Sequence, residues 1–262
     1  MWRAPDYNPL RAAFRAIALI ALLLVLFWPA LVFWLLKLDR LRARAVQLVY
    51  IFGLKFSGTT VTRRGELSTE RPLMLVANHS TYLDVFVLGK LTPVSFTPKK
   101  EIKSWPVIGF LCVLADCVFV ERKPSEITEA KTQMERRLDK DKVLCLFPEG
   151  TTSDGKTTLP FRSGFLSLAE EYQMEVQPAT IVYTHIGDEP MSDARRDEVA
   201  WIGETTFFGH FFHLLGLPSL KAEVVLHPPL HFTDFEDRKE LTKAAEETIR
   251  QSLAEIWGAH AG

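Results

Sequence analysis

The stretch Asn78-His79-Ser80-Thr81-Tyr82-Leu83-Asp84 directly follows an apolar run, residues 72–77, that predicts a buried strand. The apolar residues 85–88 come next, and Ser80 or Thr81 is a suitable N-cap for a helix that begins here. A strand that ends in a polar turn before a helix is a common ligand site in α/β folds, because ligands bind beyond the carboxyl ends of strands. The stretch therefore predicts both the fold class and the position of a functional site.

His79 and Asp84 are the residues of this stretch best suited to proton transfer. In a continuous helix their five-residue separation, at about 100° per residue, would point them in different directions. A pair therefore requires His79 in the turn and Asp84 in the first helical turn, where a negative charge also suits the helix dipole. A histidine oriented by a carboxylate is a general base for a hydroxyl or thiol group. The alternative is a capped turn in which Asp84 is an ordinary first-turn acid.

The base has no obvious nucleophile within the chain. Ser80 adjoins His79, but no Gly-x-Ser-x-Gly elbow surrounds it, and nothing nearby supplies the third member of a hydrolase triad. We therefore expect the histidine to act on a hydroxyl group of the substrate.

The composition bounds the class of protein. The chain has 262 residues, 47% of them hydrophobic, and a net charge of -1, which supports one sizeable domain with an attachment and argues against nucleic-acid binding. The three cysteines, Cys112, Cys117 and Cys145, lie in apolar surroundings and indicate buried thiols in a reducing compartment. The seven histidines show no metal-ligand spacing, so no metal site is expected. No bound cofactor is expected either.

Residues 16–36 are uncharged and almost wholly apolar, and a helix needs about 20 such residues to cross a bilayer. The segment is too long for a cleaved signal peptide. Basic residues flank it on both sides: Arg11 and Arg15 before it, and Lys37, Arg40, Arg42 and Arg44 after it. The larger cluster predicts a cytoplasmic membrane protein whose downstream domain lies on the cytoplasmic face. Pro29 would kink the helix, so insertion into one leaflet competes with a span.

Short apolar runs alternate with amphipathic segments along the rest of the chain. Strands are expected at residues 93–97, 117–120, 143–147, 176–183 and 222–226, and helices at residues 124–139, 165–172 and 237–257. Residues 63–66 predict a turn, and residues 41–60 an amphipathic stretch. This alternation predicts an α/β sheet that is packed by helices on both faces. We expect a membrane anchor over residues 1–45 and a catalytic domain over residues 46–262.

A second polar turn follows the strand predicted at residues 143–147. The sequence Phe147-Pro148-Glu149-Gly150-Thr151-Thr152-Ser153-Asp154-Gly155 supplies hydroxyl groups, a carboxylate and free backbone N–H groups. Such turns bind phosphate groups or oxyanions. The alternative is an ordinary turn, which Ser-Asp-Gly also signals.

Taken together, these segments resemble the glycerolipid acyltransferase family of the PlsC type, which includes the 1-acylglycerol-3-phosphate acyltransferases. Four family blocks occur in order between about residues 72 and 184: Asn78, His79 and Asp84; then Lys100-Glu101-Ile102, Trp105-Pro106, Gly109 and Phe119-Val120-Glu121-Arg122; then Phe147-Pro148-Glu149-Gly150-Thr151; and finally Val176-Gln177-Pro178. The resemblance implies the family's α/β fold, a mixed and mostly parallel sheet flanked by helices. It also implies that residues 46–262 form an acyltransferase domain.

The resemblance implies transfer of a fatty acyl group from a thioester, acyl-CoA or acyl carrier protein, to the hydroxyl group of a lysolipid. The acceptor expected first is 1-acyl-sn-glycerol-3-phosphate, which would give phosphatidic acid. The alternatives are another lysolipid, such as lyso-ornithine lipid or a lysophospholipid, and a non-catalytic lipid-binding protein, which the intact His79 and Asp84 disfavour. His79 would be the base, and Asp84 would hold it.

The family's second and third blocks bind glycerophosphate, which would give that role to Lys100, Arg122, Glu149, Gly150 and Thr151, and Arg162 aligns with a basic family position. The three cations also have structural interpretations: a solvated surface for Lys100, a strand-end ion pair for Arg122 and a helix start for Arg162. Two departures stand out. Thr152 occupies a position where the family often has arginine, and Ala115 and Asp116 occupy one where it usually has glycine.

Overall fold

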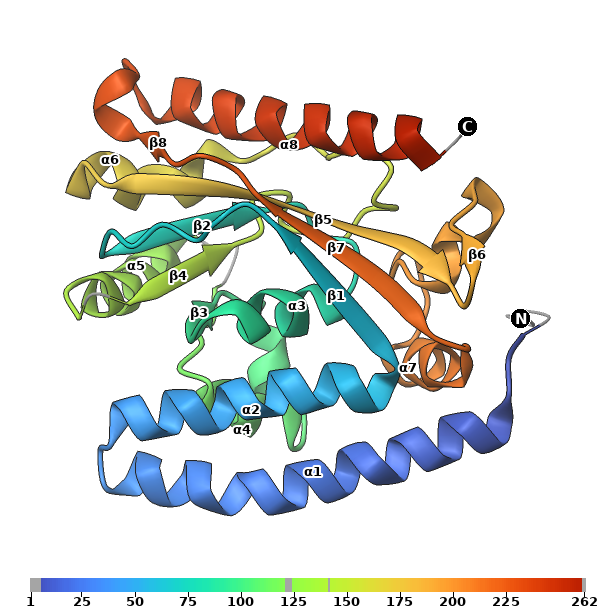
Figure 1. Ribbon diagram of the computed structural model, residues 1–262. Helices are drawn as coiled ribbons and strands as arrows, with labels where there is room; N and C mark the ends of the chain where they lie inside the picture. The colour runs from blue at the N-terminus through green and yellow to red at the C-terminus, as the bar shows by residue number, and fades with distance from the viewer. Residues whose placement is uncertain (1–5, 121–123, 141, 261–262) are drawn as a thin grey trace.

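An eight-stranded sheet runs through the computed structural model of the protein, which describes residues 6–120, 124–140 and 142–260 (Figure 1). Along its main path the strand order is β1-β7-β5-β2-β4-β3, and β6 and β8 pair with β5. The strands are β1 Thr59–Arg64, β2 Leu73–Ala77, β3 Val94–Phe96, β4 Val143–Leu146, β5 Glu175–Ile186, β6 Glu189–Pro190, β7 Leu220–Leu226 and β8 Leu230–His231. The pairs β1–β7, β5–β2, β2–β4 and β4–β3 are parallel, whereas β7 runs antiparallel to β5. The sheet is therefore mixed and mostly parallel, as predicted.

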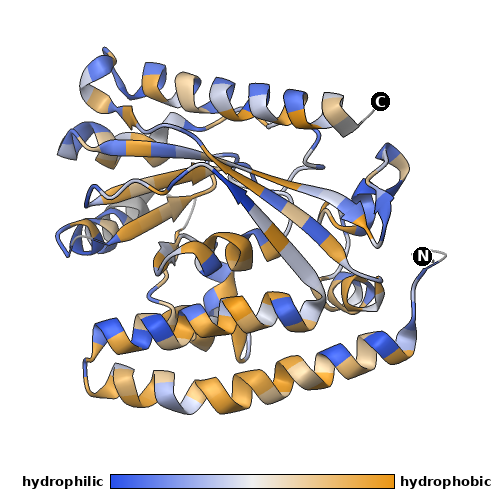
Figure 2. Cartoon of the chain, in the orientation of Figure 1, coloured by the Kyte–Doolittle hydropathy of each residue, from blue (hydrophilic) through white to orange (hydrophobic). Residues whose placement is uncertain are grey.

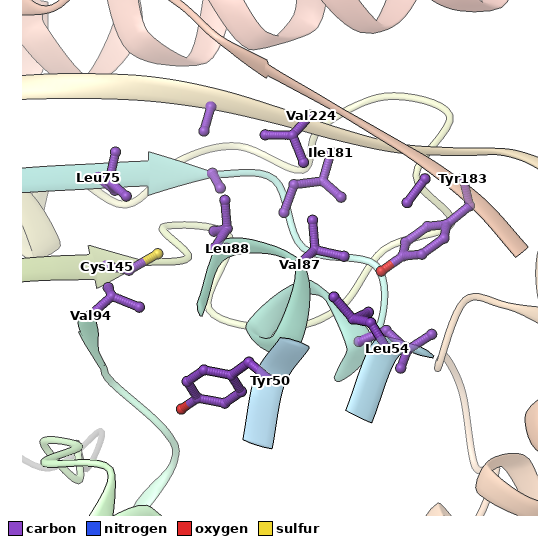
Figure 3. Packing of buried hydrophobic residues seen from close by; sticks show 14 of the residues in the cluster. Tyr50, Leu54, Leu75, Val87, Leu88, Val94, Cys145, Ile181, Tyr183 and Val224 are labelled. Atoms are coloured by element: carbon purple, nitrogen blue, oxygen red, sulfur yellow. The ribbon is translucent and has the colours of Figure 1, made fainter. Parts of the chain in front are cut away.

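The central strands β2 and β4 are buried at every residue. Their sequences, LMLVA and VLCL, are continuous apolar runs because helices cover both faces of the sheet. On one face Leu75 and Cys145 pack with Val87, Leu88 and Leu54, as Figure 3 shows. Met74, Val76 and Leu144 point to the other face and form a second cluster. The predicted two-sided core is confirmed.

Two sets of helices cover the sheet. The first core cluster includes side chains of helices α2 (Asp39–Ser57), α3 (Leu83–Leu91) and α7 (Phe207–Gly216). The second includes side chains of α5 (Pro124–Leu138), α6 (Ser167–Tyr172) and α8 (Arg238–His260). The short helix α4 (Ile108–Leu114) follows β3, and the 3₁₀ helices are η1 Lys100–Ser104, η2 Ser163–Leu166, η3 Asp193–Glu198 and η4 Phe232–Asp234. In Figure 1, α8 lies above the sheet and α2 and α3 lie below it.

Helix α1 (Pro9–Leu35) lies beside α2 along the lower edge of the molecule in Figure 1. Among the described residues it is the one helix long and apolar enough to cross a membrane, with a mean hydropathy of 2.8 and only 6% of its most apolar window buried. Figure 2 shows that hydrophobic residues make up most of this helix. The domain boundary predicted between residues 45 and 46 falls inside α2.

Both ends of α1 are attached to the rest of the protein. Near its start, Ala12 and Ala16 pack against Leu215 of α7, and the Arg15 guanidinium donates to the carbonyl of Leu217 at 2.7 Å. Near its end, Ala30 packs with residues of α2 and α4. The helix therefore lies against the domain over most of its length.

Two sequence predictions were wrong at the sheet edges. Residues 59–64 form strand β1, although a turn was predicted from residue 63, because pairing with β7 accommodates a polar edge strand that carries no periodic signal. Residues 117–120 do not form a strand and make one isolated bridge, between Val120 and Lys99. An apolar run does not form a strand unless a neighbouring strand pairs with it along its length.

Candidate active site

The turn after β2 brings His79 and Asp84 together as predicted. Strand β2 ends at Ala77, and α3 begins at Leu83, so Asp84 lies in the first turn of the helix. His79 Nδ1 lies 2.9 Å from Asp84 Oδ2. The Asp84 side chain is completely buried, whereas that of His79 is 19% exposed. The pair therefore has one enclosed member and one member that can reach a substrate.

Backbone N–H groups and a tyrosine hold the Asp84 carboxylate in place. Oδ2 accepts hydrogen bonds from the backbone N–H groups of Ser80, at 2.7 Å, and Thr81, at 3.0 Å. Oδ1 accepts a hydrogen bond of 2.8 Å from the hydroxyl group of Tyr183 on β5. Neither the Ser80 nor the Thr81 side chain caps α3 as predicted, since the N-cap residue is Tyr82 and its side chain makes no capping bond. Their N–H groups bind Asp84 instead.

Two contacts hold the imidazole ring of His79: the contact of Nδ1 with Asp84 and stacking of its face on Phe147. Its ring stacks on that of Phe147, with centroids 4.0 Å apart and planes at 15°. A carboxylate has only acceptor atoms, so Nδ1 carries the proton and Nε2 keeps a lone pair. A positioned lone pair of this kind is what a general base requires.

Glu149 ties the second polar turn to the first. Its Oε1 accepts a hydrogen bond of 2.7 Å from the His79 N–H group, and its Oε2 accepts one of 3.0 Å from Leu159. The residue is only 2% exposed. Burial raises the pKa of the Glu149 carboxyl group, and the bonds from Leu159 and His79 oppose this rise. Because both oxygens bind backbone groups, this placement favours a positioning role for Glu149 over the expected contact with an acceptor.

Three further hydrogen bonds join the site to the turn after β4 and to β5. The backbone N–H of Ser153 donates to the carbonyl oxygen of His79 at 2.8 Å. The Asn78 side chain bonds both backbone groups of Ile181, accepting from its N–H at 2.8 Å and donating to its carbonyl at 2.9 Å. The asparagine of the first block therefore anchors the turn to β5.

Gly150, Thr151 and Arg162 lie together beside the His79 turn. Gly150 has a φ of +70°, and a Cβ there would lie 3.3 Å from Cζ of Arg162, so the guanidinium packs directly on the Gly150 backbone. The Arg162 N–H also donates to the Pro148 carbonyl at 3.0 Å. Arg162 and Thr151 are exposed, so both are accessible to a ligand.

The other predicted cations lie on different segments. Lys100 begins η1, is exposed, and donates its backbone N–H to the Val120 carbonyl at 2.9 Å. Arg122 lies outside the described residues. Thr152, in the family's arginine position, donates its hydroxyl to the carbonyl of Trp201.

Two contributors were missed by the sequence analysis. Tyr183 contacts Asp84 from 99 residues away. The backbone carbonyl of Trp201 accepts a hydrogen bond from the Thr152 hydroxyl, and its backbone N–H donates to the Ser80 carbonyl at 2.8 Å. Neither residue lies in a recognisable polar motif. The only signal for Tyr183 was its position in the strand predicted at residues 176–183.

Comparisons with known proteins agree with the four motifs. The family model described as Acyltransferase matches residues 58–182. The lyso-ornithine lipid O-acyltransferase of Rhizobium meliloti (strain 1021) is 34% identical over 206 residues, which cover 76% of this chain and 70% of that protein. The 1-acyl-sn-glycerol-3-phosphate acyltransferase of Neisseria gonorrhoeae is 29% identical over 194 residues, 73% of this chain and 74% of that protein.

A solved structure shares the fold. The crystal structure of the 1-acyl-sn-glycerophosphate acyltransferase PlsC from Thermotoga maritima superimposes with a TM-score of 0.64 at 19% identity, covering 92% of this chain and 97% of that one. The fold, the motif order and the similarity to the Rhizobium protein lead to one conclusion: this chain belongs to the acyltransferase family.

Proposed function

We propose that this chain is a membrane-associated lysolipid O-acyltransferase whose acceptor is lyso-ornithine lipid and whose donor is an acyl thioester, on coenzyme A or acyl carrier protein. The observation that carries this proposal is the pairing of His79 with the buried Asp84 at the carboxyl end of β2. It supplies a fixed, partly exposed base, and among the described residues the hydrogen-bond partner of the His79 ring is Asp84, with no serine or cysteine side chain bonded to it. Such a site suits direct attack of a substrate hydroxyl on a thioester.

The reaction follows from that geometry. His79 Nε2 takes the proton of the acceptor hydroxyl as its oxygen attacks the thioester carbonyl carbon, and Asp84 stabilises the imidazolium that forms. The tetrahedral intermediate then expels the thiolate, which takes up the proton from His79. The products are an oxygen ester and a free thiol. A positioned base of this kind contributes about 10²–10⁴-fold in rate, or roughly 3–5 kcal/mol.

Similarity among relatives favours lyso-ornithine lipid over the acceptor that the motifs first predicted. The Rhizobium protein named for that lipid is 34% identical to this chain, and the Neisseria protein named for 1-acyl-sn-glycerol-3-phosphate is 29% identical. A second protein named for lyso-ornithine lipid, from Brucella abortus, is 33% identical over 75% of this chain. We therefore propose the alternative acceptor in place of the first.

The charge of the site supports the same choice. A phosphate monoester carries close to two negative charges near neutral pH, and burying it requires several cationic partners. At Thr152 the family's arginine is absent, and the hydroxyl that replaces it is bonded to Trp201. Arg162 is the cation that packs on Gly150. One guanidinium matches a single carboxylate such as that of ornithine, so we propose Arg162, Gly150 and Thr151 as the headgroup site, with Lys100 and Arg122 as further candidates.

We also propose that α1 lies in the cytoplasmic leaflet and does not cross the bilayer. Arg15 and Ala30, near opposite ends of the helix, both contact the domain, so a crossing would draw part of that domain into hydrocarbon. The outward side chains of α1 are large and apolar: Leu10, Phe14, Ile17, Ile20, Leu24, Val25, Trp28, Val32 and Leu35. They suit an interfacial helix whose apolar face enters the membrane. Residues 1–45 would then be the membrane anchor on the cytoplasmic face.

The proposal is tested with purified protein and two acceptors, lyso-ornithine lipid and 1-acyl-sn-glycerol-3-phosphate, each with acyl-CoA and with acyl-loaded carrier protein. We expect a higher kcat/KM with lyso-ornithine lipid, and a rate of ester formation about 10²–10⁴-fold lower with His79→Ala. A strong preference for the phosphate acceptor would refute the acceptor assignment and leave acyl transfer standing. Absence of transfer to any lysolipid would refute the activity itself.

A further inference from the structure

A pocket of about 530 Å³ lies at the end of the sheet away from His79. Lys142, which lines it, comes directly before β4, whereas Phe147, beneath the His79 ring, comes directly after that strand. The four residues of β4 extend over ~13 Å. The pocket is therefore separate from the proposed active site.

The lining of this pocket is strongly basic. Among the described residues that line it are six cationic side chains: Lys37, Arg42, Arg136, Arg137, Lys140 and Lys142. Two carboxylates, Asp39 and Asp116, are the acidic side chains among these described lining residues, which gives that described lining an excess of four positive charges. Such an excess in a hollow of this size matches a ligand with at least one full negative charge.

The carboxylates hold the inner cations in a fixed arrangement. Asp116 lies 3.0 Å from Arg137, 2.5 Å from Lys142 and 3.6 Å from Arg42. It has a φ of +60°, a left-handed conformation that favours glycine, so the family's usual glycine is replaced here by a residue that organises charge. Asp39 also bonds Arg42, at 3.0 Å.

Arg42 is the innermost of these cations. Its side chain is only 6% exposed, and no described residue supplies a hydrogen-bond partner for its buried Nε. A buried donor without a partner costs free energy. A ligand that supplies acceptor oxygens in the pocket would relieve that cost, and phosphate oxygens are strong acceptors for arginine.

The wall of the pocket belongs to the end of α1. Trp34 and Leu35, at the end of that helix, line it and are both exposed. Tryptophan is favoured at the boundary between lipid and water, and lysine and arginine at that depth bind anionic lipid headgroups. The pocket therefore combines a lipid-facing wall with a cationic floor.

We propose that this pocket binds the phosphate-bearing headgroup of an anionic membrane phospholipid, at a site separate from catalysis. The proposal rests on the placement of α1 in the membrane that is proposed above. The headgroup would neutralise the surplus charge and hold the end of α1 at the membrane surface. Since α2 begins beside the pocket and packs on α3, such a contact would also orient the His79 turn toward the lipid that carries the acceptor.

The test compares full-length protein with two double variants. Arg136→Gln with Lys140→Gln removes two exposed pocket cations, and Arg40→Gln with Lys55→Gln removes two exposed cations of α2 that do not line the pocket. Dissociation constants are measured for vesicles of phosphatidylcholine alone and of phosphatidylcholine with phosphatidylglycerol. The pocket variant should bind the anionic vesicles at least about tenfold more weakly than wild type, at roughly a decade or less per cation removed. The control variant, which also removes two positive charges, should lose clearly less affinity than the pocket variant.

The outcomes distinguish specific lipid binding in the pocket from general electrostatic attraction to the membrane. They also distinguish failure of this proposal from failure of the proposed activity. Equal losses in the two variants, or none in the pocket variant, would overturn the proposal. Saturable binding of free sn-glycerol 3-phosphate at micromolar concentration, lost in the pocket variant, would also overturn it in favour of a soluble phosphate. Binding to pure phosphatidylcholine and turnover of micellar substrate should be unchanged in both variants, so failure here leaves acyl transfer untouched.

Discussion

The hydroxyl group of Tyr183 donates a 2.8 Å hydrogen bond to Asp84 Oδ1, and it links β5 to the first turn of α3. Both side chains are buried, and burial, reinforced by the charge of Asp84, raises the pKa of Tyr183 well above its usual range. The hydroxyl therefore stays protonated and remains a donor throughout the working pH range. Tyr183 thus positions the carboxylate that positions His79.

Replacing Tyr183 by phenylalanine should weaken that support without emptying the core. A hydrogen bond to a charged group is worth about 1.5–3 kcal/mol, so we expect kcat to fall about tenfold or more with little change in KM. Tyr50→Phe, in the same core cluster but away from Asp84, is the matched control. An unchanged kcat would exclude the positioning role.

His79 and Asp84 should behave as one unit. His79→Ala should lower kcat by about 10²–10⁴-fold in protein that remains folded. Asp84→Asn should cost nearly as much, since it disturbs the tautomer of His79, and the double variant should be little worse than either. Single-turnover rates of the three variants, with folding checked by circular dichroism, measure this. Fully multiplicative losses would show that the two residues act independently.

Glu149 should matter first for stability. In Glu149→Gln the amide nitrogen must face one of the two backbone N–H groups that the carboxylate now accepts, from His79 and Leu159. A buried donor left without an acceptor costs about 1–3 kcal/mol, so the free energy of unfolding in urea should fall by that amount. Glu247→Gln, on the exposed side of α8, should leave it unchanged. Equal stability of the two variants would contradict this role.

Arg162 should determine affinity for the headgroup. Because its guanidinium packs on Gly150, Arg162→Ala should raise KM for lyso-ornithine lipid about tenfold, at about 1.4 kcal/mol per decade, with kcat little changed. Lys243→Ala, on exposed α8, provides the control for loss of one positive charge. In the reverse direction, Thr152→Arg should improve kcat/KM for 1-acyl-sn-glycerol-3-phosphate. A KM that is insensitive to Arg162 would place the headgroup elsewhere.

Stability should decline in mild acid because of His210. This residue is completely buried, and its Nδ1 lies 3.0 Å from the Tyr82 hydroxyl. Burial, followed by the charge of His213, lowers the pKa of His210 from 6.5 to about 4. The unfolded chain therefore binds a proton first, so the stabilisation is complete above about pH 6.5 and is lost as the pH falls toward 4.

At 1.36 kcal/mol per pH unit, the shift of His210 corresponds to about 3 kcal/mol. Urea denaturation at pH 7 and pH 4 should therefore show wild type losing about that much more free energy of unfolding than His210→Gln. If both proteins lose the same amount, other groups govern the acid response.

The sequence alone determined the central strands of the sheet and the chemistry that the turns after them could offer. Continuous apolar runs at β2 and β4 indicated strands buried on both faces, and the polar turns after them located His79, Asp84 and Glu149. These signals are local: hydrophobic periodicity, turn residues and a short spacing across one turn. Because His79 and Asp84 are separated by one turn, the sequence was sufficient to predict that their side chains could meet.

Only the tertiary structure decided how those parts meet. The Tyr183 bond to Asp84 and the Thr152 bond to Trp201 join segments 99 and 49 residues apart, and pairing of β1 with β7 joins the two ends of the domain. The placement of α1 against α7, and the gathering of Arg42, Asp116 and Lys142 around one pocket, were equally invisible in the sequence. A local pattern reports what a residue can bond, whereas the strand order decides which distant residue is within reach.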